Sequence, residues 1–354
     1  MPATNNLRSN PNIQFIENRF KHAAAIVMEK VAGHIENPSQ YPLSADSKSA
    51  ERAIYNLWMA APKHKRKKMV EKAKAHLNAG SSQRQQLYGD LAAVNLHSAL
   101  SVEEQVKTIP SKHQFTKADA DMVRAHMQQH AAKFPPKKKP TPRQASVDAT
   151  KVKVSVQTLT CNKKSELGKD EISLGAIGID ANGIQQNKNP FFVGKFKKGD
   201  SLPLGANSDL FEFDIDASSV GFPVSFSVGV FLLEEDLLHN LDLVNKLEIA
   251  CFAMWGLFMA ITFTIITVGM LGGPVTALMA YLAIALGLTF FIIGFQLLPL
   301  LADDLSDVST DILLLDAPPA VGDIFDRTLE FSISNLGGDA TIGKYTAAVR
   351  WTAE

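Results

Sequence analysis

The chain has 354 residues, which is enough for two domains of ordinary size. Its 36 Lys/Arg and 36 Asp/Glu cancel, but they are sorted along the chain: residues 1–148 hold 23 basic and 12 acidic side chains, and the remainder holds 13 and 24. A hydrophobic content of 46% excludes a wholly disordered chain, and the two cysteines exclude a disulfide framework.

The first 133 residues predict a basic α-helical domain. Apolar residues in 12–35 recur at three- and four-residue spacings, which is typical of an amphipathic helix. Ser101 and Glu104 form a capping-box pattern at the start of a later helix. Residues 134–148 contain four prolines and a lysine run, and therefore predict an extended linker.

Beyond the linker the hydrophobic period changes from helical to two. Residues 151–160 alternate polar and apolar side chains, as a half-buried strand does, and several similar segments follow, separated by Gly, Asn and Asp clusters. Residues 149–354 therefore predict an antiparallel β-sandwich.

Residues 249–302 contain no charged side chain, and this segment interrupts the predicted strands. Two apolar arms, 249–271 and 275–298, are each long enough to cross a bilayer as a helix. The alternative is a pair of central helices covered by protein on every side. The predicted fold is thus α+β multidomain: an N-terminal α-helical bundle and a C-terminal antiparallel β-sandwich interrupted by an apolar transmembrane-type helical hairpin.

Small residues repeat at four-residue spacing on the two arms, and such rows let helices approach closely in lipid. With the turn residues and one tryptophan they make up the predicted membrane-inserting set: Trp255, Gly256, Ala260, Thr264, Gly272, Gly273, Pro274, Ala280, Ala283 and Gly287.

Two basic clusters predict contact with anionic lipid: Lys63, Lys65, Arg66, Lys67 and Lys68 in a helix start, and Lys137, Lys138 and Lys139 in the linker. Lipid is preferred to nucleic acid because the hairpin already requires a bilayer. The alternative is an exposed helix face and a solvated linker.

Acidic residues cluster after the first strand and at both bases of the hairpin. Carboxylates converging from sandwich loops suit calcium, and the candidate ligands are Glu166, Asp170, Glu171, Glu235, Asp236, Asp303 and Asp304. The favoured interpretation is that they are solvated loop acids. We therefore expect no cofactor, and calcium is the alternative.

The usual motifs of a phosphate loop, a serine hydrolase, a zinc protease or a dithiol are absent from the sequence, so we expect no enzymatic activity. The predicted function is a membrane-inserting, pore- or lesion-forming protein of effector or toxin type, acting on a bilayer as a homo-oligomer. A hairpin-anchored membrane scaffold or binding protein and a structural subunit that buries the hairpin in a large oligomer are the alternatives. The polar N-terminus lacks a signal-peptide pattern, so we expect membrane association from the cytoplasmic side or after signal-independent export.

Overall fold

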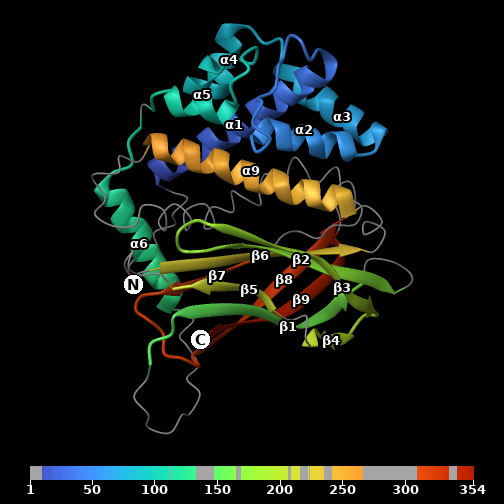
Figure 1. Ribbon diagram of the computed structural model, residues 1–354, viewed down its shortest axis with the longest axis vertical. Helices are drawn as coiled ribbons and strands as arrows, with labels where there is room; N and C mark the ends of the chain where they lie inside the picture. Colours follow the sequence, from blue (N-terminus) through green and yellow to red (C-terminus); the bar gives the residue numbers. More distant parts are fainter. Residues whose placement is uncertain are drawn as a thin grey trace. The chain divides into compact units, whose positions relative to one another are not determined.

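The computed structural model describes residues 10–111, 113–132, 147–164, 169–205, 209–215, 222, 224–234, 241–265, 309–334 and 341–354. The chain divides into two compact units. One is helical and is assembled from the N-terminal residues together with a segment beginning at residue 240; the other holds the strands (Figure 1).

The N-terminal part contributes six α-helices: α1 (Pro11–Glu36), α2 (Ala50–Ala60), α3 (Lys63–Ala73), α4 (Ser81–Tyr88), α5 (Val102–Thr108) and α6 (Lys117–Ala132). Short 3-10 turns, η2 (Lys74–His76) and η3 (Gly89–Ala93), follow α3 and α4. The seventh described helix, α9 (Leu241–Ile265), comes from the middle of the strand-bearing half of the chain.

The helix starts follow from local chemistry. Asn10 caps α1 by accepting hydrogen bonds from the backbone N–H groups of Asn12 and Ile13, and Pro11 has no N–H to satisfy there. The predicted capping box is present at α5, where Ser101 and Glu104 bond each other's backbone N–H. Burial along α1 includes Ile13, Ile16 and Phe20 at helical spacing, as the sequence predicts.

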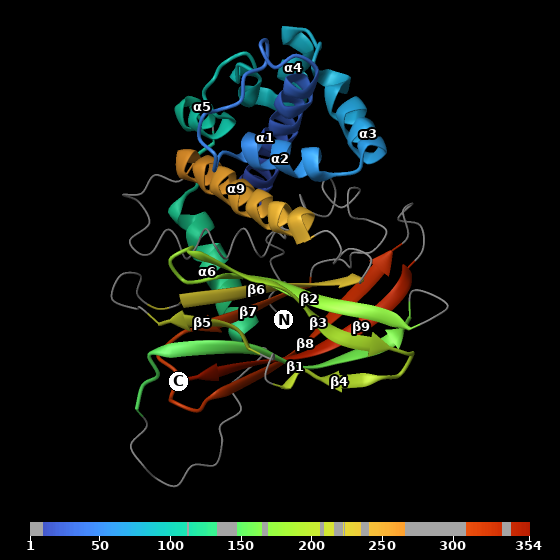
Figure 2. The same ribbon diagram turned by 45° about the vertical axis from the view of Figure 1, so that its right-hand side comes forward.

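The second unit has two antiparallel sheets (Figure 2). In the first, the order β4-β1-β9-β8 joins Ser201–Pro203, Lys151–Lys163, Thr341–Ala353 and Ile324–Ser334, and β5 (Asp209–Asp214) pairs with β1. In the second, the order β3-β2-β6-β7 joins Gln185–Phe196, Asp170–Ile179, Val224–Glu234 and Ser309–Leu315.

Both sheets contribute apolar side chains to one core, which includes Val154, Ile172, Phe226 and Trp351. The register pairs Val154 with Trp351 across β1 and β9. On β2, a Cβ on Gly175 would lie only 2.4 Å from the Phe231 ring, so glycine is required by close packing at this position.

Candidate functional site

Helix α9 forms part of the core of the helical unit. It packs against α1, α2 and α5, and Leu257, Phe258 and Ile261 are buried. The Phe258 ring meets Phe20 of α1 edge to face, with ring centroids 5.3 Å apart. This part of the predicted hairpin is therefore covered by helices of its own chain.

The predicted transmembrane-type hairpin, and the fold class containing it, are wrong for this segment. None of the helices in the described ranges combines the length and hydropathy needed to span a bilayer. Helix α9 starts before the uncharged run and carries Asp242, Lys246 and Glu248 in its first two turns. Of its described apolar side chains, Ala253, Leu257, Phe258 and Ile261 are among those buried, whereas Ile249 is exposed. The second predicted arm, 275–298, lies outside the described residues. Because the described part of the first arm packs in the helical unit, the membrane and pore assignments lose their basis.

The small-residue row on α9 has a packing role. Ala260 is buried, and a Cβ on Gly256 would lie 3.7 Å from the Glu103 carboxylate of α5. Gly256 and Ala260 thus face protein within the helical unit. Trp255 and Thr264 belong to α9, but their side chains lie outside the described residues, as do Gly272, Gly273, Pro274, Ala280, Ala283 and Gly287.

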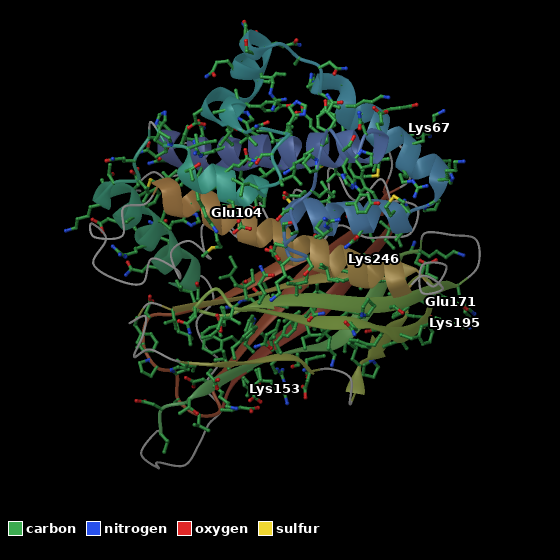
Figure 3. All side chains as sticks on the ribbon, turned by 45° about the horizontal axis from the view of Figure 1, so that its top comes forward. Lys67, Glu104, Lys153, Glu171, Lys195 and Lys246 are labelled. Atoms are coloured by element: carbon green, nitrogen blue, oxygen red, sulfur yellow. The ribbon has the colours of Figure 1, made fainter. Side chains whose placement is uncertain are left out.

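Lysines project from the solvent-facing side of α3. We define the α3 lysine row as Lys63, Lys67, Lys68 and Lys72, all of which are exposed. Figure 3 shows the labelled Lys67 at the outer edge of α3. Met69 is half-buried and Val70 is buried, so the apolar side of the helix packs inward while the lysines remain in water.

Few acidic groups neutralise the row. Lys67 lies 3.9 Å from the Glu71 carboxylate, and both side chains are largely exposed, so solvent weakens this pair. Within the described part of the chain, no ion pair joins Lys63, Lys68 or Lys72 to a carboxylate. The row therefore keeps most of its positive charge available.

The remaining basic residues of the lipid-contact prediction are placed differently. Arg66 is half-buried and donates a 3.3 Å hydrogen bond to the Met59 carbonyl oxygen. Lys74, just past α3 and not part of that prediction, pairs with Glu36 at 2.6 Å. The Lys65 side chain and residues Lys137, Lys138 and Lys139 lie outside the described residues.

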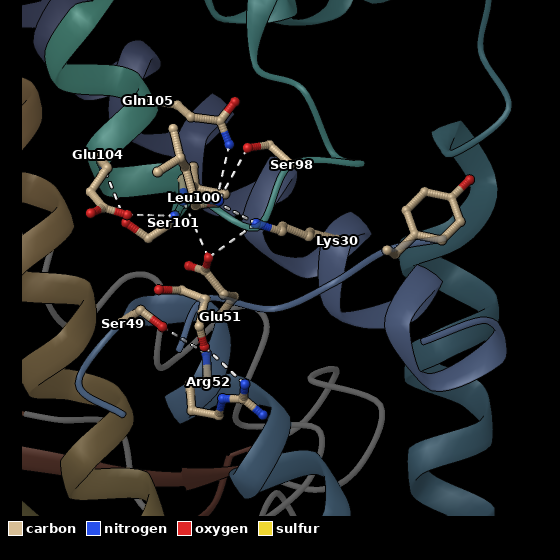
Figure 4. Close-up of polar contacts among 12 residues, drawn as sticks. Lys30, Ser49, Glu51, Arg52, Ser98, Leu100, Ser101, Glu104 and Gln105 are labelled. Carbon is tan, nitrogen blue, oxygen red and sulfur yellow. Dashed lines mark hydrogen bonds and ion pairs between the residues drawn. The ribbon is translucent and has the colours of Figure 1, made fainter. Parts of the chain in front are cut away.

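A second feature of the helical unit is a buried ion pair (Figure 4). Lys30 of α1 and Glu51 of α2 have fully buried side chains 3.2 Å apart. Lys30 also donates to the Leu100 carbonyl oxygen at 2.7 Å, and Glu51 accepts from the Val102 backbone N–H at 3.3 Å. The pair thereby ties α1 and α2 to the start of α5.

A charge cluster joins α1 to α4 and η3. We define it as Arg19, Glu29, Arg84, Tyr88 and Asp90. Arg19 pairs with Asp90, while Glu29 accepts from the Tyr88 hydroxyl and, at 2.9 Å, from Arg84. Burial, reinforced by Glu29, raises the pKa of Tyr88, so the hydroxyl stays protonated and acts as a donor. Each carboxylate has a partner, and the cluster acts chemically as a fixed ion-pair network.

The acidic residues predicted to bind calcium are not brought together where they are described. Asp170 begins β2 and is fully buried, accepting a hydrogen bond from the Tyr345 hydroxyl. Its neighbour Glu171 pairs instead with Lys195 on β3, and both are labelled in Figure 3.

Glu166, Glu235, Asp236, Asp303 and Asp304 lie outside the described residues. Over the described ranges, no group of three or more His, Cys, Asp or Glu side chains is placed to hold a metal ion.

Two buried carboxylates instead link the sheets of the sandwich. Asp170 on β2 and Asp311 on β7 both accept hydrogen bonds from β9: the first from Tyr345, the second from the Trp351 indole N–H at 2.7 Å. Cys161 contacts the same tyrosine hydroxyl, and burial raises the pKa of its thiol. These groups serve packing between the sheets, and the thiol is held in its unreactive form.

The sequence carries a signal for one of these residues. Asp170 has the same parity along β2 as the buried Ile172 and Leu174, so strand alternation predicts that it faces inward. The pairing of Lys30 with Glu51, by contrast, joins different helices, and no local pattern marks it.

Comparisons with known proteins give no relative for this chain: no family model, no curated protein and no solved structure matches it.

Proposed function

We propose that this protein is a non-enzymatic binding scaffold whose helical unit docks on an anionic macromolecule through the α3 lysine row. The observation that supports this most directly is the exposure of four lysines along one helix with a single weak ion pair among them. Such a row concentrates positive potential on one surface and attracts anionic partners.

We do not propose the pore-forming function, because it depends on an apolar hairpin that inserts into lipid. Residues 249–265 of its first arm belong to helix α9, which is used in the core of the helical unit. The binding-scaffold role needs no such rearrangement, since the lysines of α3 are already at the surface.

The test is salt-dependent retention of the full chain on immobilised heparin, a linear sulfated polyanion. Wild type should be retained at 50 mM NaCl, and the quadruple variant K63Q/K67Q/K68Q/K72Q should elute at clearly lower salt. Glutamine retains good helix propensity, so α3 should persist, and circular dichroism checks this.

The matched control is K48Q/K117Q/K198Q/K344Q, which removes the same charge from exposed lysines elsewhere. It should elute close to wild type. Equal elution of wild type and the α3 variant, or an equal shift in both variants, would show that total charge and not the row governs binding.

A further inference from the structure

We infer that the anionic macromolecule is a nucleic acid, held through its phosphate backbone without reading of the base sequence. This inference rests on the proposed function and adds the class of partner. It is carried by the spacing of the lysines, by their chemical type and by what surrounds them on α3.

The positions of the lysines suit phosphates on two sides of the helix. At about 100° per residue, Lys63 and Lys67 lie about 40° apart around the axis of α3, as do Lys68 and Lys72, and the two pairs face different sides of its exposed half. Each pair is separated by about 6 Å along the axis, and one strand of duplex DNA presents a phosphate about every 3.4 Å of its axis, so each pair can contact neighbouring phosphates.

The chemical type of the row favours backbone contact over base recognition. Lysine can contact guanine, but its ammonium group is a compact point charge, whereas Arg, Asn and Gln carry planar groups with a fixed bidentate geometry. The arginine of α3, Arg66, is half-buried and bonded to the Met59 carbonyl oxygen. The row is therefore better suited to neutralising phosphates than to selecting a base.

The surroundings argue against the other two classes of partner. Helices that lie on membranes bury large apolar side chains beside their lysines, but the exposed side chains that are described on α3 are Lys63, His64, Lys67, Lys68, Glu71 and Lys72. Protein interfaces are depleted of lysine and enriched in aromatic residues, Met and Arg. The sequence-based preference for lipid relied on the hairpin, and the burial of α9 removes that reason.

The experiment measures binding of the full chain to fluorescently labelled 20-base-pair DNA duplexes of two unrelated sequences, by anisotropy, between 25 and 200 mM NaCl. Wild type should bind both with affinities within about threefold, because phosphate contacts do not depend on sequence. In K63Q/K67Q/K68Q/K72Q, the slope of log K against log salt should be shallower by about three to four. The control K48Q/K117Q/K198Q/K344Q should keep the wild-type slope.

Four results would overturn the inference. A wild-type slope retained by the α3 variant would place DNA binding elsewhere, and a preference above about tenfold for one duplex would demonstrate base readout. Row-dependent retention on heparin, or row-dependent binding to phosphatidylserine vesicles, without DNA binding would reject nucleic acid while leaving the proposed docking function standing. If the α3 variant bound heparin, vesicles and DNA as wild type does, both the inference and the proposed docking function would be rejected.

Discussion

His22 lies beside the charge cluster of α1, with its ring 6.0 Å from that of Tyr88 in an edge-to-face arrangement. Burial lowers the pKa of His22 from its ordinary 6.5, and the nearby Asp90 only partly opposes this effect. The adjacent Lys21 lowers the pKa further. The folded helical unit therefore favours the neutral imidazole.

The lowered pKa of His22 determines how the stability of the helical unit changes with pH. A lowered pKa means that the unfolded chain binds the proton more readily, so the contribution of His22 is complete above about pH 6.5 and is lost as the pH falls below it. We expect H22F, which keeps a ring against Tyr88 but cannot be protonated, to lose less stability than wild type between pH 7.5 and 5.5. Urea unfolding followed by the helical circular dichroism signal measures this.

The quantity compared is the loss of unfolding free energy between pH 7.5 and 5.5 in each protein. A change in the absolute stability of H22F therefore does not affect the comparison. Identical losses in wild type and variant would show that His22 does not couple protonation to folding.

At the scale of elements, two substitutions on α9 test whether its apolar surface lies in the core of the helical unit. F258A removes a buried ring that packs on Phe20, and we expect it to reduce the free energy of unfolding by about 3–5 kcal/mol. Ile249, on the same helix, is 49% exposed, and I249A should cost less than about 1 kcal/mol. Chemical denaturation of both variants provides the measurement.

A helix exposed to lipid or solvent along its whole length would give a different result. Both substitutions would then have small and similar effects on the unfolding of the helical unit. A large effect confined to Phe258 would support the packing of α9 against α1.

The same elements show what local sequence can and cannot predict. The periodicity of residues 12–35 predicts α1, and the Ser101–Glu104 spacing predicts the start of α5, because both depend on neighbours within a turn or two. An apolar helix has the same composition whether lipid or protein surrounds it. The placement of α9 depends on α1, α2 and α5, which are distant in sequence, so the hydropathy of 249–271 alone could not distinguish the two environments.

For the candidate site, too, local sequence predicts some features and not others. The exposed lysines of α3 were predictable, because a dense run of charge rarely becomes buried. Their availability was not, since it depends on where the carboxylates of other elements lie: Glu36 of α1 pairs with Lys74, outside the row. On sequence grounds we expect Asp170 among the loop acids, whereas its parity on β2 marks it as inward-facing.

For the whole molecule, the described residues of the helical unit come from two stretches that are not adjacent in sequence. Because α9 supplies Leu257, Phe258 and Ile261 to its core, we expect residues 1–133 alone to lack a cooperative thermal transition. Joining residues 241–265 to this fragment through a flexible Gly/Ser linker of about 20 residues should restore it. Calorimetry distinguishes the two chains.

The control is the same fusion carrying F258A, which should show a weaker or lower-temperature transition. A cooperative transition in residues 1–133 by themselves would mean that the N-terminal helices form an independent core. In that case α9 would pack onto a core that is already complete without it.

The position of α9 in the chain also sets an order of events during synthesis. Leu241 follows Ala132, the last residue of α6, by 109 residues, which a ribosome working at about 5–20 residues per second adds in roughly 5–20 s. Helical proteins with local contacts fold in microseconds to milliseconds. The N-terminal helices of a nascent chain must therefore wait for their missing core helix, and the time needed to complete the helical unit in a cell is set by the pace of translation.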